Sequence, residues 1–172
     1  MEHESLAKEL NRVSRLHGEF RLRSGSTSAE YFDKYQFESD PKLLNAIAGA
    51  LAGLLPSGID ALAGLELGGV PVATALSLRT GLPVVFVRKQ AKSYGTCRLA
   101  EGCEIAGRRL LIVEDVVTSG GQVLESCEEL RRAGAIVDDV VCVIDRQAGG
   151  VEALSSRGLR LRSLFTKSVL DG

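Results

Sequence analysis

The sequence predicts an α/β protein with a central, mainly parallel sheet flanked by helices, and three observations carry this prediction. Short runs of β-branched and aliphatic residues alternate along the chain with segments of helical spacing. Gly residues, of which there are 19, punctuate the boundaries between these segments. No Pro/Ser-rich linker, block of like charges or internal repeat divides the 172 residues, so we expect one domain over residues 1–172.

Helices dominate the predicted N-terminal half. Apolar residues at spacings of four and three predict an amphipathic helix from about Ser5 to Leu16. Ser39-Asp40-Pro41 is typical of a helix start, because a capping side chain precedes Pro at the first helical position. That helix should run from Pro41 to about Leu55, followed by a strand over 59–67 and a helix over 71–79.

The C-terminal half carries the predicted buried strands. Continuous apolar runs over 83–87, 109–113 and 140–144 are typical of strands covered on both faces. Helices are predicted over 122–133 and 151–157, and the alternation over 159–164 is typical of an edge strand. Ligands of parallel sheets bind beyond the carboxyl ends of the strands. Polar residues that follow each apolar run are therefore the candidates for a functional site.

Composition narrows the class of protein. There are 21 Lys and Arg residues against 22 Asp and Glu, and a net charge of −1 argues against a dedicated nucleic-acid partner. The most apolar stretch, 46–67, is interrupted by Pro56, Asp60 and Glu66, which argues against a membrane span. The four cysteines form no C-x-x-C pair, so we expect reduced thiols in a cytoplasmic protein rather than a zinc site or disulfide framework.

The strongest chemical signal follows the predicted strand over 109–113. Glu114-Asp115 ends that strand, and a loop of small residues, Thr118–Gly121, opens the next helix. Backbone N–H groups and hydroxyls at the positive end of a helix suit a phosphate. The two carboxylates suit sugar hydroxyls or a hydrated Mg²⁺. The chain lacks a Walker A lysine and a G-x-G-x-x-G motif, so the pattern indicates a phosphosugar site rather than ATP hydrolysis or NAD binding.

A cationic segment follows the predicted strand over 83–87. Arg88, Lys89 and Lys92 lie within five residues, and the stretch 90–107 has no clear helical or strand period. Such a segment is often a lid, whose cations would close over an anionic leaving group. Taken alone, the segment is explained better as a solvated basic loop.

Three weaker segments could also contribute to a site. Tyr31 and Phe32 could stack on a planar base with Arg23 reaching an anion, or these aromatic residues could simply belong to the core. The glycine-rich segment 64–71 could let the backbone approach a pyrophosphate. Arg146, just beyond the predicted strand over 140–144, fits either a ligand clamp or a salt bridge.

Taken together, these segments resemble a known family. Val113–Gly121 resembles the phosphoribosyl-pyrophosphate (PRPP) signature of type I phosphoribosyltransferases. The resemblance narrows to orotate phosphoribosyltransferases and runs from about Leu16 to Arg146. It implies the type I fold, with a small N-terminal hood and a flexible catalytic loop. The segments that narrow it are Gly18–Gly25, Tyr31-Phe32, Arg88–Lys92 and Ile144–Arg146.

The resemblance implies an activity, a cofactor and an assembly. The family transfers the phosphoribosyl group of PRPP to orotate, giving orotidine 5′-monophosphate and pyrophosphate in pyrimidine biosynthesis. Mg²⁺ would be held mainly through PRPP and water, with no direct protein ligands. The loop Arg88–Thr96 would be shared across the interface of a homodimer.

The resemblance also assigns residues. The catalytic residues would be Lys92, Glu114 and Asp115. Orotate would be bound by Arg23, Tyr31, Phe32, Thr118 and Arg146. PRPP would be bound by Arg88, Lys89, Lys92, Glu114, Asp115, Val116, Val117, Thr118, Ser119, Gly120, Gly121 and Gln122.

Three positions depart from the family pattern, and three other readings stay open. Tyr94 stands where many relatives have His, Gly68 where many have Lys in the pyrophosphate loop, and Arg23 where many have Lys. Other interpretations are a phosphoribosyltransferase for a purine base, an RNA-binding pyrimidine regulator on the same fold, and a receiver-type signalling domain. The net charge disfavours the regulator, and the cationic loop would be unexplained in a receiver domain.

Overall fold

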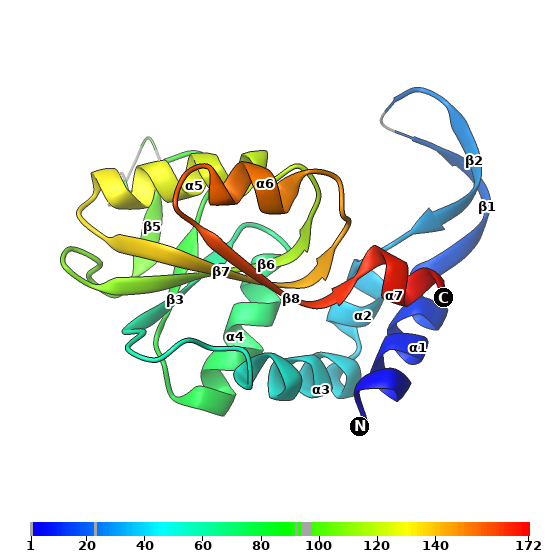
Figure 1. Ribbon diagram of the computed structural model, residues 1–172, viewed down its shortest axis with the longest axis horizontal. Coiled ribbons are helices and arrows are strands. Elements are labelled where there is room, and N and C mark those ends of the chain that lie inside the picture. Colours follow the sequence, from blue (N-terminus) through cyan, green and yellow to red (C-terminus); the bar gives the residue numbers. More distant parts are fainter. Residues whose placement is uncertain (1, 23, 92, 94–97) are drawn as a thin grey trace.

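A six-stranded sheet forms the centre of the computed structural model, which describes residues 2–22, 24–91, 93 and 98–172 (Figure 1). The strands lie in the order β5-β4-β3-β6-β7-β8. All neighbouring pairs are parallel except β4 and β5, which are antiparallel. This confirms the predicted mainly parallel sheet. The strands are β3 (Ala61–Leu65), β4 (Val84–Val87), β5 (Ala100–Gly102), β6 (Arg109–Val117), β7 (Ile136–Asp145) and β8 (Arg160–Thr166).

Helices cover both faces of the sheet (Figure 1). On one face lie α3 (Pro41–Ala52) and α4 (Gly69–Thr80), and on the other α5 (Gly121–Arg132) and α6 (Gly150–Ser155). Side chains of β6 alternate between the two faces, so Leu111 belongs to the core against α3 and α4, and Ile112 to the core against α5. Burial on both faces explains why this strand reads as a continuous apolar run.

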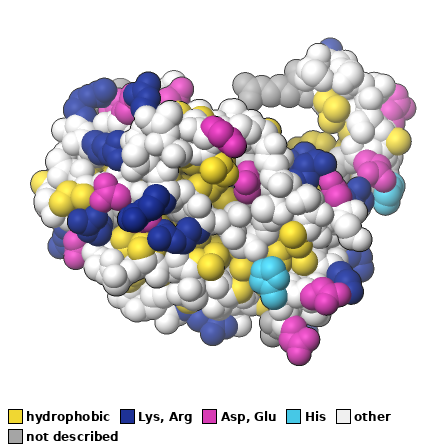
Figure 2. All heavy atoms as spheres, in the orientation of Figure 1, with side chains coloured by type: hydrophobic (Ala, Val, Ile, Leu, Met, Phe, Trp, Pro, Cys, Tyr) yellow, Lys and Arg dark blue, Asp and Glu magenta, His cyan; other side chains and the backbone are white. Residues whose placement is uncertain are grey.

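The N-terminal segment and the C-terminus pack together at one end of the sheet. Helix α1 (His3–Ser14) contacts α2 (Tyr35–Ser39), α3 and the last helix, α7 (Lys167–Asp171). Between α1 and α2, β1 (Arg15–Arg21) and β2 (Thr27–Phe32) form an antiparallel hairpin. Figures 1 and 2 show this hairpin as an arm that extends from the body of the molecule.

Several predicted boundaries are corrected by the structure. The first helix ends at Ser14, because the chain turns there into β1, whose pairing with β2 replaces the last helical turn. The hairpin, α2, β5 and α7 were not predicted at all. Helix α3 begins as expected, since the Asp40 carboxylate accepts hydrogen bonds from the N–H groups of Lys42 and Leu43. That helix ends at Ala52 rather than near Leu55.

The correction that bears on function concerns β6. It does not end at Val113 but continues through the acidic pair to Val117, because those residues pair with β7 as far as Asp145. The carboxylates therefore project from a rigid strand rather than from a loop. Among the described residues, no helix is long and apolar enough to cross a membrane.

Removing the buried carboxylate of Asp139 on β7 is expected to destabilise the sheet. Arg160 and Arg162 of β8 donate hydrogen bonds to its two oxygens at distances from 2.5 to 3.1 Å. We expect Asp139→Ala to lower the free energy of unfolding by about 2–3 kcal/mol, because two guanidinium groups lose their partner. Asp138→Ala removes a half-exposed pair with Arg109 and should cost less than about 1 kcal/mol.

The pH dependence of unfolding checks the same contact. Burial alone would raise the pKa of Asp139, but the two guanidinium groups outweigh it and lower the pKa. Stability from this carboxylate is therefore present above its unfolded pKa of about 4 and is lost as the pH falls through the lower folded pKa. Equal costs for Asp138→Ala and Asp139→Ala in urea unfolding would contradict the assignment.

Candidate active site

Two carboxylates lie at the carboxyl end of β6, where the sequence predicted them. Glu114 and Asp115 are both buried, with exposed fractions of 8% and 1%. The N–H of Asp115 donates to Glu114 Oε1 at 3.0 Å, and the N–H of Val116 donates to Asp115 Oδ1 at 2.5 Å. These bonds fix one oxygen of each carboxylate.

The second oxygen of Asp115 faces the short helix α2. Lys34 Nζ lies 2.5 Å from Asp115 Oδ2, and its side chain is about one-third exposed. Glu38, one turn further along α2, is 7% exposed and also lies against Asp115. Lys34 and Glu38 were not singled out from the sequence, because nothing local shows that α2 packs on the end of β6.

The pKa values of the three neighbouring carboxyl groups shift in opposite directions: those of Glu114 and Glu38 are raised, and that of Asp115 is lowered. Burial and then the neighbouring Asp115 raise the pKa of Glu114 well above its usual range. Burial and the contact with Asp115 raise the pKa of Glu38 to about 9. Burial alone would also raise the pKa of Asp115, but its close contacts with Glu38, Glu114 and Lys34 outweigh burial and lower it. At neutral pH, Asp115 is therefore the ionised carboxylate and Glu38 a neutral acid.

Beyond β6, the predicted phosphate loop leads directly into α5. Thr118 and Ser119 are exposed, and Gly120 has a left-handed φ of 81°, which suits glycine. Gly120 caps α5 without any side-chain hydrogen bond, so the N–H groups of Gly121 and Gln122 at the helix start have no capping side chain. This is a favourable arrangement for an anion.

Val116 and Val117 lie in β6 and not in the phosphate loop. They pair with Ile144 and Asp145 of β7, and the carbonyl of Val117 accepts from the N–H of Arg146 at 2.9 Å. The Val117 side chain is buried. These two residues therefore fix the position of the loop, and only their backbone could meet a phosphate.

The glycine-rich segment packs against the end of β6. A Cβ on Gly69 would lie 2.3 Å from the carbonyl oxygen of Val113, and a Cβ on Gly68 would lie 1.6 Å from Asp115 Oδ2. Both distances are far too short for a side chain. Close packing on the backbone of β6 therefore requires glycine at position 69, whereas a side chain at position 68 would displace the Asp115 carboxylate. The sequence alone did not reveal either contact.

Part of the predicted cationic loop lies beside α5. The N–H of Arg88 donates to the carbonyl of Leu99 at 2.9 Å, which closes the base of the loop. Arg88, Lys89 and Gln122 line a common cavity of about 450 Å³. Two of the predicted loop cations thus lie near the start of α5. Lys92 and the predicted departure at Tyr94 lie outside the described residues.

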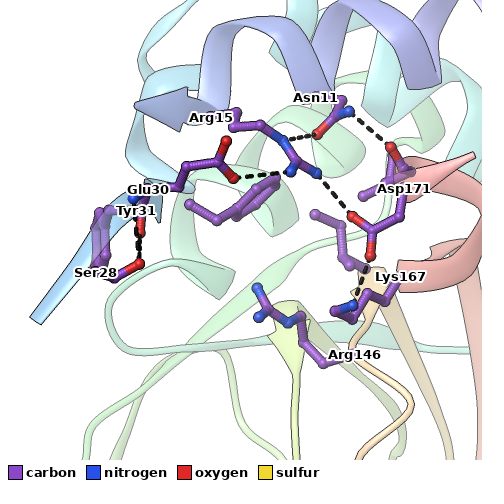
Figure 3. Close-up of a pocket in the computed structure, with 11 residues that line it drawn as sticks. Asn11, Arg15, Ser28, Glu30, Tyr31, Arg146, Lys167 and Asp171 are labelled. Atoms are coloured by element: carbon purple, nitrogen blue, oxygen red, sulfur yellow. Dashed lines mark hydrogen bonds and ion pairs between the residues drawn. The ribbon is translucent and has the colours of Figure 1, made fainter. Parts of the chain in front are cut away.

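A second cavity, of about 360 Å³, brings together three of the five residues expected to bind orotate, and Thr118 is not among the residues that line it (Figure 3). Tyr31, Phe32 and Arg146 all line it, and the guanidinium carbon of Arg146 lies 5.8 Å from the ring centroid of Phe32. Tyr31 is 45% exposed, which removes the interpretation that it is simply a core residue. Phe32 packs partly against the core, and Arg23 lies outside the described residues.

The sequence did not predict the other charged residues of this cavity. Arg15 lies between Glu30 and Asp171, at 3.2 and 2.8 Å, and Lys167 lies 2.6 Å from Asp171 (Figure 3). They come from β1, β2 and α7, which are close to the two ends of the chain. No local pattern connects such distant segments.

The side chains near the acidic pair include possible ligands of a metal ion. In the described part of the chain, no group of three or more His, Cys, Asp and Glu side chains is arranged to hold a metal ion. Lys34 already occupies one side of Asp115. A Mg²⁺ held by oxygens of the substrate and by water would be compatible with these residues.

The acidic pair of β6 and the start of α5 lie together at the carboxyl end of a parallel strand. This arrangement is typical of α/β enzymes that bind a phosphorylated sugar. Comparison with known proteins agrees. Residues 35–157 match the family model described as the phosphoribosyl transferase domain. Orotate phosphoribosyltransferase from Nocardioides sp. (strain ATCC BAA-499 / JS614) is 54% identical over 97% of this chain and 93% of its own.

Solved structures give the same result. The crystal structure of Mycobacterium tuberculosis H37Rv orotate phosphoribosyltransferase in complex with Fe(III) dicitrate is 34% identical over 98% of both chains, with a TM-score of 0.89. The structure of the same enzyme in complex with PRPP is 30% identical over 99% of both chains, with a TM-score of 0.85. The chain belongs to the phosphoribosyltransferase family, and within it to the orotate phosphoribosyltransferases.

Proposed function

We propose that this protein transfers the phosphoribosyl group of PRPP to orotate, giving orotidine 5′-monophosphate and pyrophosphate in pyrimidine biosynthesis. The observation that carries the proposal is the continuous run from the acidic pair of β6 through Thr118–Gly121 into α5. It presents carboxylates and, a few residues further on, the N–H groups at the start of α5, as a phosphorylated sugar requires. The named relatives, which match nearly the whole chain, support orotate as the base.

The proposed roles follow the geometry. Glu114 and Asp115 accept hydrogen bonds from the ribose hydroxyls. The 5′-phosphate is bound by Thr118, Ser119, Gly120, Gly121 and Gln122, next to the backbone of Val116 and Val117. Orotate binds in the cavity lined by Tyr31, Phe32 and Arg146. The resemblance adds Thr118 and Arg23 as further orotate-binding residues, and Arg23 lies outside the described residues. Arg146 supplies positive charge for the anionic base in the cavity of Figure 3, where Arg15 and Lys167 are paired with acidic side chains.

In the reaction, the bond between the anomeric carbon and pyrophosphate breaks, and the orotate nitrogen forms a bond to that carbon from the opposite face. Arg88, Lys89 and Lys92 stabilise the charge that develops on pyrophosphate. Closure of their loop excludes water, which would hydrolyse PRPP. Mg²⁺ bound through PRPP would supply further charge neutralisation. A homodimer that shares this loop, and a cytoplasmic location, belong to the same proposal.

The absorbance of orotate tests the function. Purified protein with PRPP and Mg²⁺ should consume orotate, and EDTA should stop the reaction. Adenine in place of orotate is the control for a purine-base enzyme. Consumption of adenine but not orotate would overturn the choice of base while leaving the phosphosugar site in place.

Replacing Arg146 is expected to weaken orotate binding selectively. Arg146→Leu should raise the KM for orotate on the order of 10- to 100-fold, because a charge-assisted contact is lost, and change the KM for PRPP less than about 2-fold. Arg157→Leu, which removes a surface cation paired with Glu128, should change neither. A rise confined to the KM for PRPP would contradict the placement of orotate.

Replacing Lys92 is expected to affect turnover more than binding. Lys92→Ala should lower kcat on the order of 100-fold and change the KM for orotate little, since the loop acts mainly in the transition state. Mixing Lys92→Ala subunits with Asp115→Asn subunits should recover activity, because one site of each mixed dimer then has both native residues. Equal losses in kcat and orotate binding would contradict the role of Lys92, and mixtures without recovery would contradict the shared loop.

A further inference from the structure

The short helix α2 meets the end of β6 at the carboxylate proposed to bind ribose. We infer that Lys34 and Glu38 are positioning residues for Asp115, with Lys34 as its counter-cation and Glu38 as a neutral acid that donates a hydrogen bond to it. The inference deepens the proposed function and rests on it, because it takes Asp115 to be a ribose ligand. It assigns a task to α2, which the mechanism above does not use.

The first step concerns the charge of Asp115. The side chain is 1% exposed, and a buried carboxylate without a partner would take up a proton and lose strength as an acceptor. Lys34 Nζ lies 2.5 Å from Asp115 Oδ2. Because the Lys34 side chain is still about one-third exposed, its ammonium group keeps part of its hydration. Lys34 therefore supplies the charge that keeps the buried carboxylate ionised.

The second step concerns the proton on Glu38. Written as a carboxylate, Glu38 has two buried oxygens with no hydrogen-bond partner in the described part of the chain. Two facing carboxylates can only accept, so their contact is repulsive. With one proton, Glu38 becomes a donor to Asp115 and the contact becomes a hydrogen bond. Burial is the main cause of this protonated form, Asp115 and Glu114 of β6 also favour it, and Lys34 opposes it.

The third step concerns the space around the carboxylate. Gly68 closes a further side of Asp115, because a Cβ there would lie 1.6 Å from Oδ2 and 3.0 Å from Glu38 Oε1. The N–H of Val116 holds the other oxygen at 2.5 Å. Asp115 is thus fixed by a cation, a neutral acid and two backbone segments. Such a fixed acceptor requires little reorganisation when the ribose hydroxyls arrive.

Steady-state kinetics and PRPP-induced thermal stabilisation of the full-length protein test the inference. Lys34→Met should raise the KM for PRPP on the order of 10- to 100-fold, since a hydrogen bond to a charged group is weakened, and leave the KM for orotate within about 2-fold. It should also reduce the rise in Tm that PRPP causes. Lys42→Met, an exposed lysine on α3, is the matched control and should change neither.

The variants of Glu38 separate positioning from simple packing. Glu38→Gln keeps an N–H donor toward Asp115 and should stay within about 3-fold of the native KM for PRPP. Glu38→Leu keeps the volume but not the donor, and should raise that KM on the order of 10-fold. A merely structural role would lower Tm and the active fraction in both variants without a selective change in the KM for PRPP.

Several outcomes would overturn the inference. An unchanged KM for PRPP in Lys34→Met would remove Lys34 as a positioning residue, and tighter PRPP binding would show that it competes with the ribose. A Glu38→Gln variant as impaired as Glu38→Leu would remove the donor role. If the native protein binds PRPP without consuming orotate, the Tm measurements still test Lys34 and Glu38 and only the choice of base fails. If it does not bind PRPP, both proposals fail.

Discussion

Gly68→Ala is expected to lower kcat/KM for PRPP on the order of 100-fold while the protein still folds. The new Cβ would lie 1.6 Å from Asp115 Oδ2, so the carboxylate must leave its position. Glu38 Oε1, at 3.0 Å, closes the neighbouring space. The displaced Asp115 would lose its contact with Lys34 and its alignment toward the ribose hydroxyls. The variant should therefore approach the loss caused by removing the carboxylate itself.

The stability of this variant should change less than its activity. Inserting one methyl group into a packed site typically costs about 1–3 kcal/mol, and the atom it meets belongs to a side chain that can rotate. In Gly69→Ala the new methyl would lie 2.3 Å from the backbone carbonyl of Val113, which cannot rotate away. We expect Gly69→Ala to lower Tm more than Gly68→Ala does, in thermal unfolding of both purified variants.

A third glycine supplies the control. Gly53, which follows α3, has a negative φ and no atom closer than 3.4 Å to the position of a Cβ. Gly53→Ala should leave both kcat/KM and Tm close to the native values. Native turnover in Gly68→Ala would contradict the close packing of Gly68 on Asp115. It would also weaken the inference that Asp115 must be held in one position to bind the ribose hydroxyls.

The strands of the sheet and the phosphate loop were predictable because their signals are local. β4, β6 and β7 each appear in the sequence as an apolar run, and β6 and β7 are buried on both faces as expected. β4 corrects the expectation, because Val85 and Val87 are buried on one face while Phe86 on the other is 41% exposed. The phosphate loop and the acidic pair are contiguous with one such run. Within this segment only the end of β6 was wrong, since the sequence does not show that polar Glu114 and Asp115 continue the pairing with β7.

The N-terminal hairpin could not be predicted in the same way. Most residues of β1 and β2 are exposed or only partly buried, so neither strand shows a clean alternation of apolar and polar residues. The pairing with each other, rather than burial in a core, holds these strands together. Tyr31 and Arg146 show what local patterns cannot predict. They line one cavity, although most of the strands of the sheet lie between them in the sequence.

The residues that surround Asp115 were the hardest part of the site to predict from the sequence. Glu38 belongs to a five-residue helix, and Lys34 directly precedes it; the pattern of so short a helix does not reveal a buried face. Gly68 was noted only as a position without a lysine side chain, and its close contact with Asp115 depends on the packing of a loop against β6. Three separate segments of the chain meet here, and only the folded structure relates them.

Asp115→Asn is expected to lower kcat/KM for PRPP on the order of 100-fold, and to remove most of the effect of Lys34→Met. The amide keeps the size of the side chain but loses the negative charge that both the ribose hydroxyls and Lys34 need. Once that charge is gone, Lys34 no longer has a carboxylate to position. Lys34→Met should then cost less than about 3-fold in the Asp115→Asn background, against the order of 10- to 100-fold in the native protein.

A double-mutant cycle on kcat/KM for PRPP measures this dependence. We expect a coupling free energy of about 1–2 kcal/mol between positions 34 and 115, which is typical of residues in direct contact. Lys34→Met combined with Arg146→Leu is the reference cycle, because Arg146 lines the base cavity and should be additive with Lys34 within about 0.5 kcal/mol. Equal coupling in both cycles would mean that Lys34 acts on the site as a whole. Coupling confined to Asp115 would locate its action at the carboxylate that α2 encloses.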